Sequence, residues 1–246
     1  MSVALITGAS RGLGRALGAA LAGRGWDLVL DARTAGALEE TAQELRRRYG
    51  TRVVAVAGDV TDPGHRAQLA SAARELGGLD LLVSNASALG AEPLVRLDAL
   101  ATAGLRQALE TNVVAALGLV QETLPLLRSA DAGAVVVVSS DAAAEAYPAW
   151  GGYGASKAAL DQLAAVLGVE EPGLRVWAVD PGDMQTTLYA AAVPDDDDPR
   201  PRPESVAPAF LWLLDGRPAS GRYSAPALLQ AAGAASGAAS GSGEER

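Results

Sequence analysis

The sequence predicts an α/β fold in which about seven parallel strands alternate with helices that cover both faces of the sheet. Short runs of Val, Leu and Ala recur along the chain, and segments with the apolar periodicity of helices separate them. The first run, Val3–Ile6, leads into a glycine-rich turn, and the turn leads into a helical segment. Strands and helices that alternate through short connections typically form such a doubly wound sheet.

The same patterns locate the later elements in order. Residues 134–139 include four valines, which indicates a strand buried on both faces, and Pro63 suits the first turn of a helix. We expect further strands at residues 26–30, 52–57, 79–83, 134–139 and 174–179. We expect further helices at residues 37–49, from residue 63 onward, and at residues 101–127, 153–167 and 203–214.

Length and composition are those of one globular domain. The chain has 246 residues, of which 49% are hydrophobic and 20% are charged. We expect a single domain over residues 1–230 and a disordered tail over residues 231–246, where Ala, Gly and Ser predominate. Residues 194–203 contain four consecutive aspartates and four prolines, so we expect no regular element there.

Charge and residue content exclude several classes of function. A net charge of −9 argues against nucleic-acid binding, which needs a basic surface. With no cysteine and a single histidine, we expect no thiolate or histidine metal site. No signal peptide precedes the first strand, and no apolar run approaches the roughly 20 residues of a membrane span, so we expect a cytoplasmic protein without a membrane partner. We expect His65 to be exposed and to have no role.

The turn at residues 7–14 is the first functional motif. Its glycines, Gly8, Gly12 and Gly14, have the spacing G-x-x-x-G-x-G between a strand and a helix. Glycine permits a tight turn and a close approach of backbone to a pyrophosphate, and the N-terminus of the helix favours that anion. The turn therefore predicts a dinucleotide site, with a plain helix-starting turn as the alternative.

Tyr153 and Lys157 form a second candidate motif. Their spacing of four residues places both side chains on one face of the predicted helix. An adjacent ammonium lowers the pKa of a phenol, which would bring Tyr153 towards the range where acid–base catalysis is efficient. Ser140, at the end of a predicted strand, could donate a hydrogen bond to a substrate carbonyl oxygen. An exposed Tyr–Lys pair without a chemical role is the alternative.

Several motifs, in order along residues 3–230, resemble those of the short-chain dehydrogenase/reductase family. They are the glycine turn, Asp59-Val60, Ser84-Asn85-Ala86-Ser87, Asn112, Ser139-Ser140, Tyr153-Gly154-Ala155-Ser156-Lys157, and Pro181-Gly182 with Thr186. The resemblance implies a Rossmann-like fold, a nicotinamide cofactor, and interconversion of a carbonyl and an alcohol. Ser84 and Ser87 depart from the family's Asn-Asn-Ala-Gly, which puts the hydrogen bonds of that turn in question.

The resemblance also assigns roles to individual residues. It implies that Tyr153 acts as general acid or base, that Lys157 lowers the pKa of Tyr153 and binds the ribose, and that Ser140 orients the substrate oxygen. Asn112 would hold a water that passes protons to Lys157, with a core amide bonded to backbone as the alternative. Thr186 would bind the nicotinamide carboxamide. The implied cofactor-binding residues are Gly8, Ser10, Arg11, Gly12, Leu13, Gly14, Arg33, Asp59, Val60, Asn85, Ala86, Tyr153, Lys157, Pro181, Gly182 and Thr186.

The choice between NADP(H) and NAD(H) depends on the end of the second strand. In family register, Ala32 stands where NAD enzymes have an acid, Arg33 stands where NADP enzymes have a cation, and Arg11 adds a second guanidinium. We therefore expect NADP(H). NAD(H) is the alternative, because Asp31 could bind the ribose instead of pairing with one of the arginines. The resemblance places Asp59 at the adenine, with a turn cap as its alternative role.

The segments that determine the substrate are expected beyond the strand ends, at residues 88–95, 142–150 and 184–203. Within them, a partly apolar site is suggested by Tyr147, Trp150, Leu188 and Tyr189. Residues 194–203 are expected to form either a mobile lid or a solvated loop. The resemblance implies a homodimer or homotetramer that acts on a small-molecule carbonyl or alcohol. A non-catalytic dinucleotide-binding regulator is the alternative function, and an accessory domain of a biosynthetic assembly is a third.

Overall fold

The computed structural model describes residues 1–240, with side chains placed as far as Ala232. The described residues form one seven-stranded sheet with the order β3-β2-β1-β4-β5-β6-β7, in which every neighbouring pair is parallel. The predicted α/β class is therefore confirmed. The strands are β1 (Val3–Ile6), β2 (Asp27–Ala32), β3 (Val53–Ala57), β4 (Leu81–Ser84), β5 (Ala134–Val138), β6 (Arg175–Asp180) and β7 (Gly221–Ser224).

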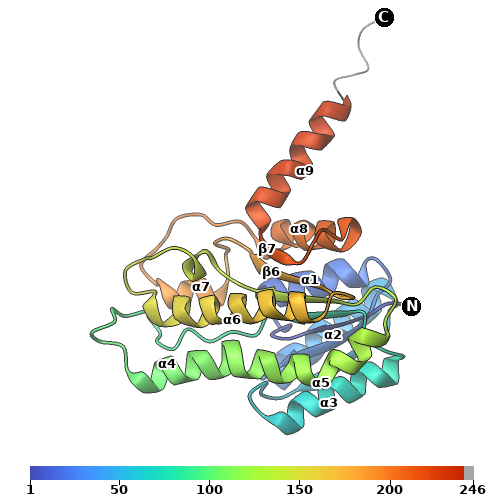
Figure 1. Cartoon of the computed structure of the whole chain (residues 1–246), viewed down its shortest axis with the longest axis horizontal. Coiled ribbons are helices and arrows are strands. Elements are labelled where there is room, and N and C mark those ends of the chain that lie inside the picture. The colour runs from blue at the N-terminus through green and yellow to red at the C-terminus, as the bar shows by residue number, and fades with distance from the viewer. Residues whose placement is uncertain (241–246) are drawn as a thin grey trace, which may run out of the picture.

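Helices pack on both faces of this sheet (Figure 1). One face carries α1 (Gly12–Ala22), α2 (Ala35–Tyr49) and α8 (Pro203–Gly216). The other carries α3 (Pro63–Leu76), α5 (Ala115–Ser129) and α6 (Gly151–Glu170). Each layer has its own core because successive side chains of a strand point to opposite faces. In β2, for example, Leu28 and Leu30 join the first core and Val29 joins the second.

The order of the strands reverses between β1 and β4, which pair with each other at the centre of the sheet. In open α/β sheets, the carboxyl ends of the strands at such a switch point form the ligand site. β1 leads into the glycine turn and β4 leads into residues 85–88, while β5 is followed directly by Ser139-Ser140 and β6 by Pro181-Gly182. Most of the predicted motifs therefore meet at one edge of the sheet.

The long helix expected over residues 101–127 is divided into three parts. α4 (Thr102–Leu109) is followed by the π-helix η1 (Glu110–Val114), which continues into α5. A π-helical turn is wider than an α-helical turn and occurs mostly as a short bulge, often at a functional site. Asn112 lies within η1 and is 1% exposed. The apolar pattern of this stretch runs on without interruption, so it does not reveal the change of helix type.

Three further elements differ from the expectations. The strand β7 is short and polar, and the helix α7 (Thr187–Ala192) is brief, so neither has enough periodicity to be located from sequence. α9 (Ala225–Ser240) includes residues 231–240 of the expected tail, in keeping with the high helix propensity of Ala, and extends away from the other helices (Figure 1). Residues 241–246 of that tail lie outside the described residues. No helix within residues 1–240 is long and apolar enough to cross a membrane.

Candidate active site

The turn between β1 and α1 has room only for glycine at two positions. Gly8 has φ +65°, and a Cβ there would lie 2.9 Å from Nδ2 of Asn85. A Cβ on Gly14 would lie 2.4 Å from the carbonyl oxygen of Gly8. α1 begins at Gly12, so the free N–H groups of its first turn face the same place. This backbone cradle at a helix N-terminus fits the pyrophosphate of a dinucleotide.

Thr7 and Asn85 connect the glycine turn to the end of β4. The Thr7 hydroxyl accepts hydrogen bonds from the backbone N–H groups of Asn85 and Ala86, both at 2.9 Å. The Asn85 amide donates to the Thr7 carbonyl at 2.8 Å. Ser87 donates to Oδ1 of Asn112 at 3.1 Å. The two serines that replace the family's Asn and Gly therefore leave this turn well bonded to the central strands.

Asn112 is hydrogen-bonded to protein through both ends of its amide. Oδ1 accepts from the Ala88 backbone N–H at 2.8 Å. Nδ2 donates to the Ala88 carbonyl at 2.9 Å and to the Ser156 hydroxyl at 2.8 Å. These are the partners of a structural amide. They connect η1 and the loop after β4 to α6 at the residue that precedes Lys157.

Tyr153 and Lys157 lie in the first turns of α6 and are both buried, with 6% and 2% exposure. The Lys157 ammonium lies 5.5 Å from the centre of the Tyr153 ring and donates to the Val138 carbonyl at 2.7 Å. The ring of Trp150 meets Tyr153 edge-on at a centroid distance of 5.7 Å. The helix thus places both side chains on one face, as their spacing predicts, but that face is buried against the end of β5.

Burial shifts the pKa values of both groups, in opposite directions. The pKa of Tyr153 is raised to about 12, mainly by burial and to a smaller extent by the carboxylates of Asp141 and Asp180. A hydrogen bond with Ser87 acts in the opposite direction and lowers this pKa. Burial lowers the pKa of Lys157 to about 8. The expected depression of the Tyr153 pKa is therefore wrong for this structure, because loss of hydration outweighs the lowering hydrogen bond with Ser87.

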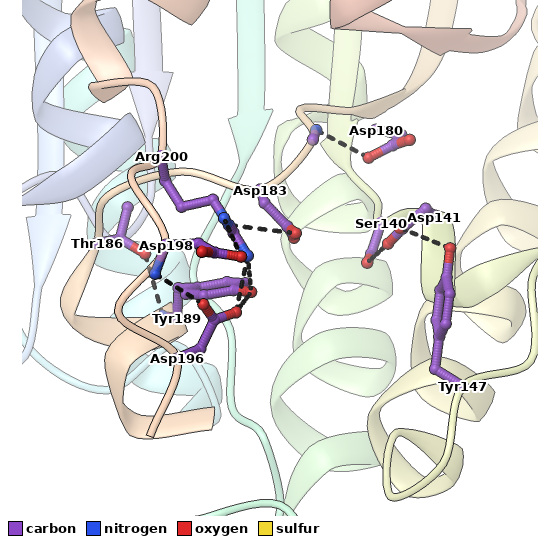
Figure 2. A network of polar contacts seen from close by, with 11 residues as sticks. Ser140, Asp141, Tyr147, Asp180, Asp183, Thr186, Tyr189, Asp196, Asp198 and Arg200 are labelled. Carbon is purple, nitrogen blue, oxygen red and sulfur yellow. Dashed lines mark hydrogen bonds and ion pairs between the residues drawn. The ribbon is translucent and has the colours of Figure 1, made fainter. Parts of the chain in front are cut away.

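Ser140 lies beside an acidic group at the start of the 3-10 helix η2 (Asp141–Ala143). Its hydroxyl donates to the Asp141 carboxylate at 3.0 Å and accepts from the Ala142 N–H at 3.2 Å. Tyr147 donates towards Asp141 at 3.1 Å (Figure 2). It also donates towards Glu145 at 2.9 Å. The hydrogen bonds to these two carboxylates raise the pKa of Tyr147 well above its usual value, and the bond to Glu145 contributes most. Ser140 is thus available at the strand end but engaged with Asp141.

The turn after β6 brings Thr186 next to the glycine turn. Gly182 has φ +71°, and its N–H donates to the Asp180 carboxylate at 2.9 Å. Thr186 caps α7 by accepting from the Tyr189 N–H at 3.1 Å. A Cβ on Gly12 would lie 3.5 Å from the Thr186 methyl group. The segments expected at the pyrophosphate and at the nicotinamide are therefore adjacent.

A polar cluster centred on Arg200 lies across from Ser140 (Figure 2). The Arg200 guanidinium donates to the Tyr189 hydroxyl at 3.0 Å and to Asp196 at 2.7 Å, and it lies 5.2 Å from the centre of the Tyr189 ring. The carboxylates of Asp183 and Asp198 lie 3.7 Å and 3.8 Å from it. Arg200 therefore connects the irregular aspartate-rich segment to α7 and to the turn after β6.

A small apolar cluster surrounds Tyr153. Its buried members come from four different segments, and they are Leu89, Ala142, Tyr153 and Ala192. Trp150 and Leu188 pack against it. Three of the contributing segments are those expected to determine the substrate. The site is therefore lined by apolar side chains beside the Tyr153 phenol, whereas its polar groups lie at Asp141 and Arg200.

Two exposed arginines lie at the cofactor end of the sheet, Arg11 within the glycine turn and Arg33 directly after β2. Within residues 1–240, the guanidinium groups of Arg11 and Arg33 have no hydrogen-bond or ion-pair partner. Asp59 accepts two hydrogen bonds from Thr61, at 2.9 Å and 2.8 Å, which lower its pKa, and Arg33 adds to this effect. Asp59 thus caps a turn, beside the buried Val60. Two guanidinium groups without a protein partner fit a phosphate at this end of a dinucleotide.

Asp31 and His65 form a buried pair that the sequence patterns did not predict. Nε2 of His65 lies 2.6 Å from Oδ1 of Asp31, and the two residues are 4% and 1% exposed. The expectation of an exposed His65 is wrong, and Asp31 pairs with His65 rather than with an arginine. A signal for this was present, since His65 precedes Leu69 and Leu76 at helical spacing on the buried face of α3.

Comparison with known proteins identifies the family of this chain. Residues 2–197 match the model of the short chain dehydrogenase family. Sepiapterin reductase of Rattus norvegicus is 36% identical over 214 residues, which cover 82% of this chain and 81% of the relative. A Shigella flexneri short chain dehydrogenase complexed with NADP superposes with a TM-score of 0.86 at 29% identity, covering 92% of this chain and 97% of that structure.

An alcohol dehydrogenase of Thermococcus sibiricus, complexed with 5-hydroxy-NADP, superposes with a TM-score of 0.83 at 28% identity and covers 91% of this chain and 95% of that structure. The family match spans well over half of the chain, and the reductase relative matches most of its length. The parallel sheet with helices on both faces agrees with the fold of the two solved structures. The chain therefore belongs to the short-chain dehydrogenase family of NAD(P)-dependent oxidoreductases.

Proposed function

We propose that this protein uses NADP(H) to interconvert a carbonyl and an alcohol on a small molecule, with Tyr153 as general acid and base. The observation that carries the proposal is that Tyr153 and Lys157 share a buried face of α6 at the end of β5, and Ser140 follows that strand at the same edge of the sheet as the glycine turn. The choice of NADP(H) is supported by the free guanidinium groups of Arg11 and Arg33 and by the NADP complexes of the two similar structures.

When bound, NADP(H) supplies or accepts the hydride at the substrate carbon. Tyr153 donates its phenolic proton to the carbonyl oxygen during reduction and takes a proton from the alcohol during oxidation. Its pKa of about 12 keeps the phenol protonated at neutral pH, which is the form that reduction requires. Ser140 turns its hydroxyl from Asp141 to the same substrate oxygen and orients it.

Lys157 acts on both partners of this chemistry. Its ammonium would bind the hydroxyls of the ribose. Its charge would also stabilise the phenolate of Tyr153, because the ammonium nitrogen lies 5.5 Å from the centre of the Tyr153 ring. A pKa of about 8 allows Lys157 to release and regain a proton near neutral pH. Asn112, bonded to the Ala88 backbone and to Ser156, acts as a positioning residue that holds α6 at the residue before Lys157.

We also propose that residues 194–203 form a lid over the substrate. Arg200 holds this segment to α7 and to Asp183 in the turn after β6, so its movement would change the wall of the site that faces Ser140 (Figure 2). Lids of this kind exclude water and retain the substrate. The lid is independent of the acid–base proposal and is tested separately below.

We propose a homodimer or homotetramer. Large apolar side chains are exposed on η1, α5 and α6, where a second copy would cover Val114, Leu117, Val166 and Val169. Light scattering coupled to size exclusion should give twice or four times the chain mass of 24.9 kDa. A monomer at micromolar concentration would contradict this proposal.

The reaction is tested with purified protein, NADPH and a panel of aldehydes and ketones, and with NADP⁺ and the matching alcohols. We expect turnover of at least one carbonyl class, followed by nicotinamide absorbance. NADPH binding should be verified by fluorescence in the same preparation. Tight binding without turnover of any panel member in either direction would contradict an enzyme and would support a nucleotide-binding regulator.

A further inference from the structure

We infer that His65 is a positioning residue for cofactor selectivity, because it retains the Asp31 carboxylate on the α3 side of β2, away from the 2′-phosphate. The inference rests on the proposed use of NADP(H), but concerns only the adenosine end of the cofactor. It depends on no part of the acid–base chemistry.

The alternation of side chains along β2 determines where Asp31 points. Leu30 and Ala32 face the core formed with α1, α2 and α8, whereas Val29 faces the core formed with α3 and α5. Asp31 therefore lies on the face of Val29, where His65 of α3 meets it at 2.6 Å. Ala32 stands one residue further on and faces the glycine-turn side.

The Asp31 carboxylate depends on His65 for its place in the interior. Burial raises the pKa of Asp31, and the hydrogen bond and charge of His65 oppose this, with a smaller contribution from the Gly8 backbone. A buried carboxylate without a partner is costly, so loss of the imidazole would favour movement of Asp31 towards water. The imidazole itself has little freedom, since a Cβ on Gly58 would lie 2.3 Å from its Nδ1.

Four charged or titratable groups interact electrostatically at this place, and they are Asp31, His65, Asp59 and Arg33. Asp59 raises the pKa of Asp31, and Arg33 and His65 both lower the pKa of Asp59. The hydrogen bond and charge of His65 lower the pKa of Asp31 and offset part of the cost of burying its carboxylate. An unpaired, ionised Asp31 would compete for Arg33 and repel a phosphate at that guanidinium. NADH carries only hydroxyls at this place, so the penalty falls on NADPH.

The test is the ratio of the dissociation constants of NADPH and NADH, measured by fluorescence titration without any substrate. His65→Leu should weaken NADPH binding by about tenfold and NADH binding much less. His65→Gln should retain most of the wild-type ratio, because its amide can donate to Asp31 from a similar position. The double variant Asp31→Asn, His65→Leu should recover the ratio, since the displaced charge is gone.

An unchanged ratio in His65→Leu, even with a lower melting temperature, would show a purely structural pair and overturn the inference. A double variant whose ratio of the NADPH to the NADH dissociation constant is as high as that of the single variant would also overturn it. If His65→Leu does not fold, His65→Asn replaces it, because the Asn side chain is too short to reach Asp31. The same change in the ratio of the dissociation constants is then expected of His65→Asn. Tighter binding of NADH than NADPH by the wild-type protein would instead refute the proposed cofactor as well.

Discussion

The buried ammonium of Lys157 leads to a prediction about stability that does not depend on substrate or cofactor. The side chain is 2% exposed, and its ammonium donates a hydrogen bond to the Val138 carbonyl. Burial lowers the pKa of Lys157 from 10.5 to about 8. A fall of this size means that the native protein holds the charged form about 3 kcal/mol less favourably than the unfolded chain does.

The sign of the pH dependence follows from the two pKa values. Below pH 8, both the native and the unfolded protein carry the ammonium, so the cost of burying it is fully present. As the pH rises from 8 towards 10.5, the native protein loses the proton while the unfolded chain still holds it, and the cost disappears. The contribution of Lys157 to native stability therefore increases with pH across this window.

The measurement compares the wild type with Lys157→Met, which has a similar length and no titration. The free energy of unfolding of the wild type, relative to the variant, should increase by about 3 kcal/mol between pH 7 and pH 10.5. The hydrogen bond that Met lacks adds a constant, and Tyr153 is common to both proteins. Urea unfolding at several pH values gives the difference. A difference that stays constant, or that moves the other way, would refute the burial of this charge.

Three further predictions concern cofactor and substrate. Arg33→Ala should weaken NADPH binding by roughly tenfold or more and leave NADH binding nearly unchanged in fluorescence titration, since a charged hydrogen bond contributes about 1.5–3 kcal/mol; equal losses would contradict a phosphate contact. Replacing Asp195 to Asp198 with Ser should change KM for the carbonyl substrate but not NADPH affinity, and an unchanged KM across several substrates would indicate a solvated loop. Arg200→Met should raise KM more than it lowers kcat, with Arg200→Lys milder because it keeps the charge but loses the planar fork. A smaller effect of Met than of Lys on KM would contradict the role of Arg200 in holding the lid.

The sequence predicted the sheet and the motifs at its edge because the responsible signals are local. Apolar runs locate the central strands, and the steric demands of the turn at residues 7–14 require glycine at Gly8 and Gly14 whatever lies around them. The helical spacing of Tyr153 and Lys157 likewise determines that they share a face. These inferences need no knowledge of tertiary packing.

The features that were missed depend on which residues meet in three dimensions. The direction of the Tyr153 pKa shift follows from its burial, which the spacing of Tyr153 and Lys157 does not determine. The pairing of Asp31 with His65 joins positions 34 residues apart. The contacts of Arg200 involve an irregular segment without periodicity. In each case, the composition of the segment is compatible with several partners.

The most direct test of the proposed chemistry is the paired measurement of turnover and NADPH affinity in Tyr153→Phe. The substitution removes one hydroxyl from a ring that packs among Leu89, Ala142 and Ala192, so the fold and the cofactor site should be retained. General acid catalysis typically contributes 10²–10⁴-fold, so kcat should fall by at least about a hundredfold while the dissociation constant of NADPH stays within a few-fold. Turnover close to that of the wild type, with NADPH still bound, would contradict Tyr153 as the proton donor.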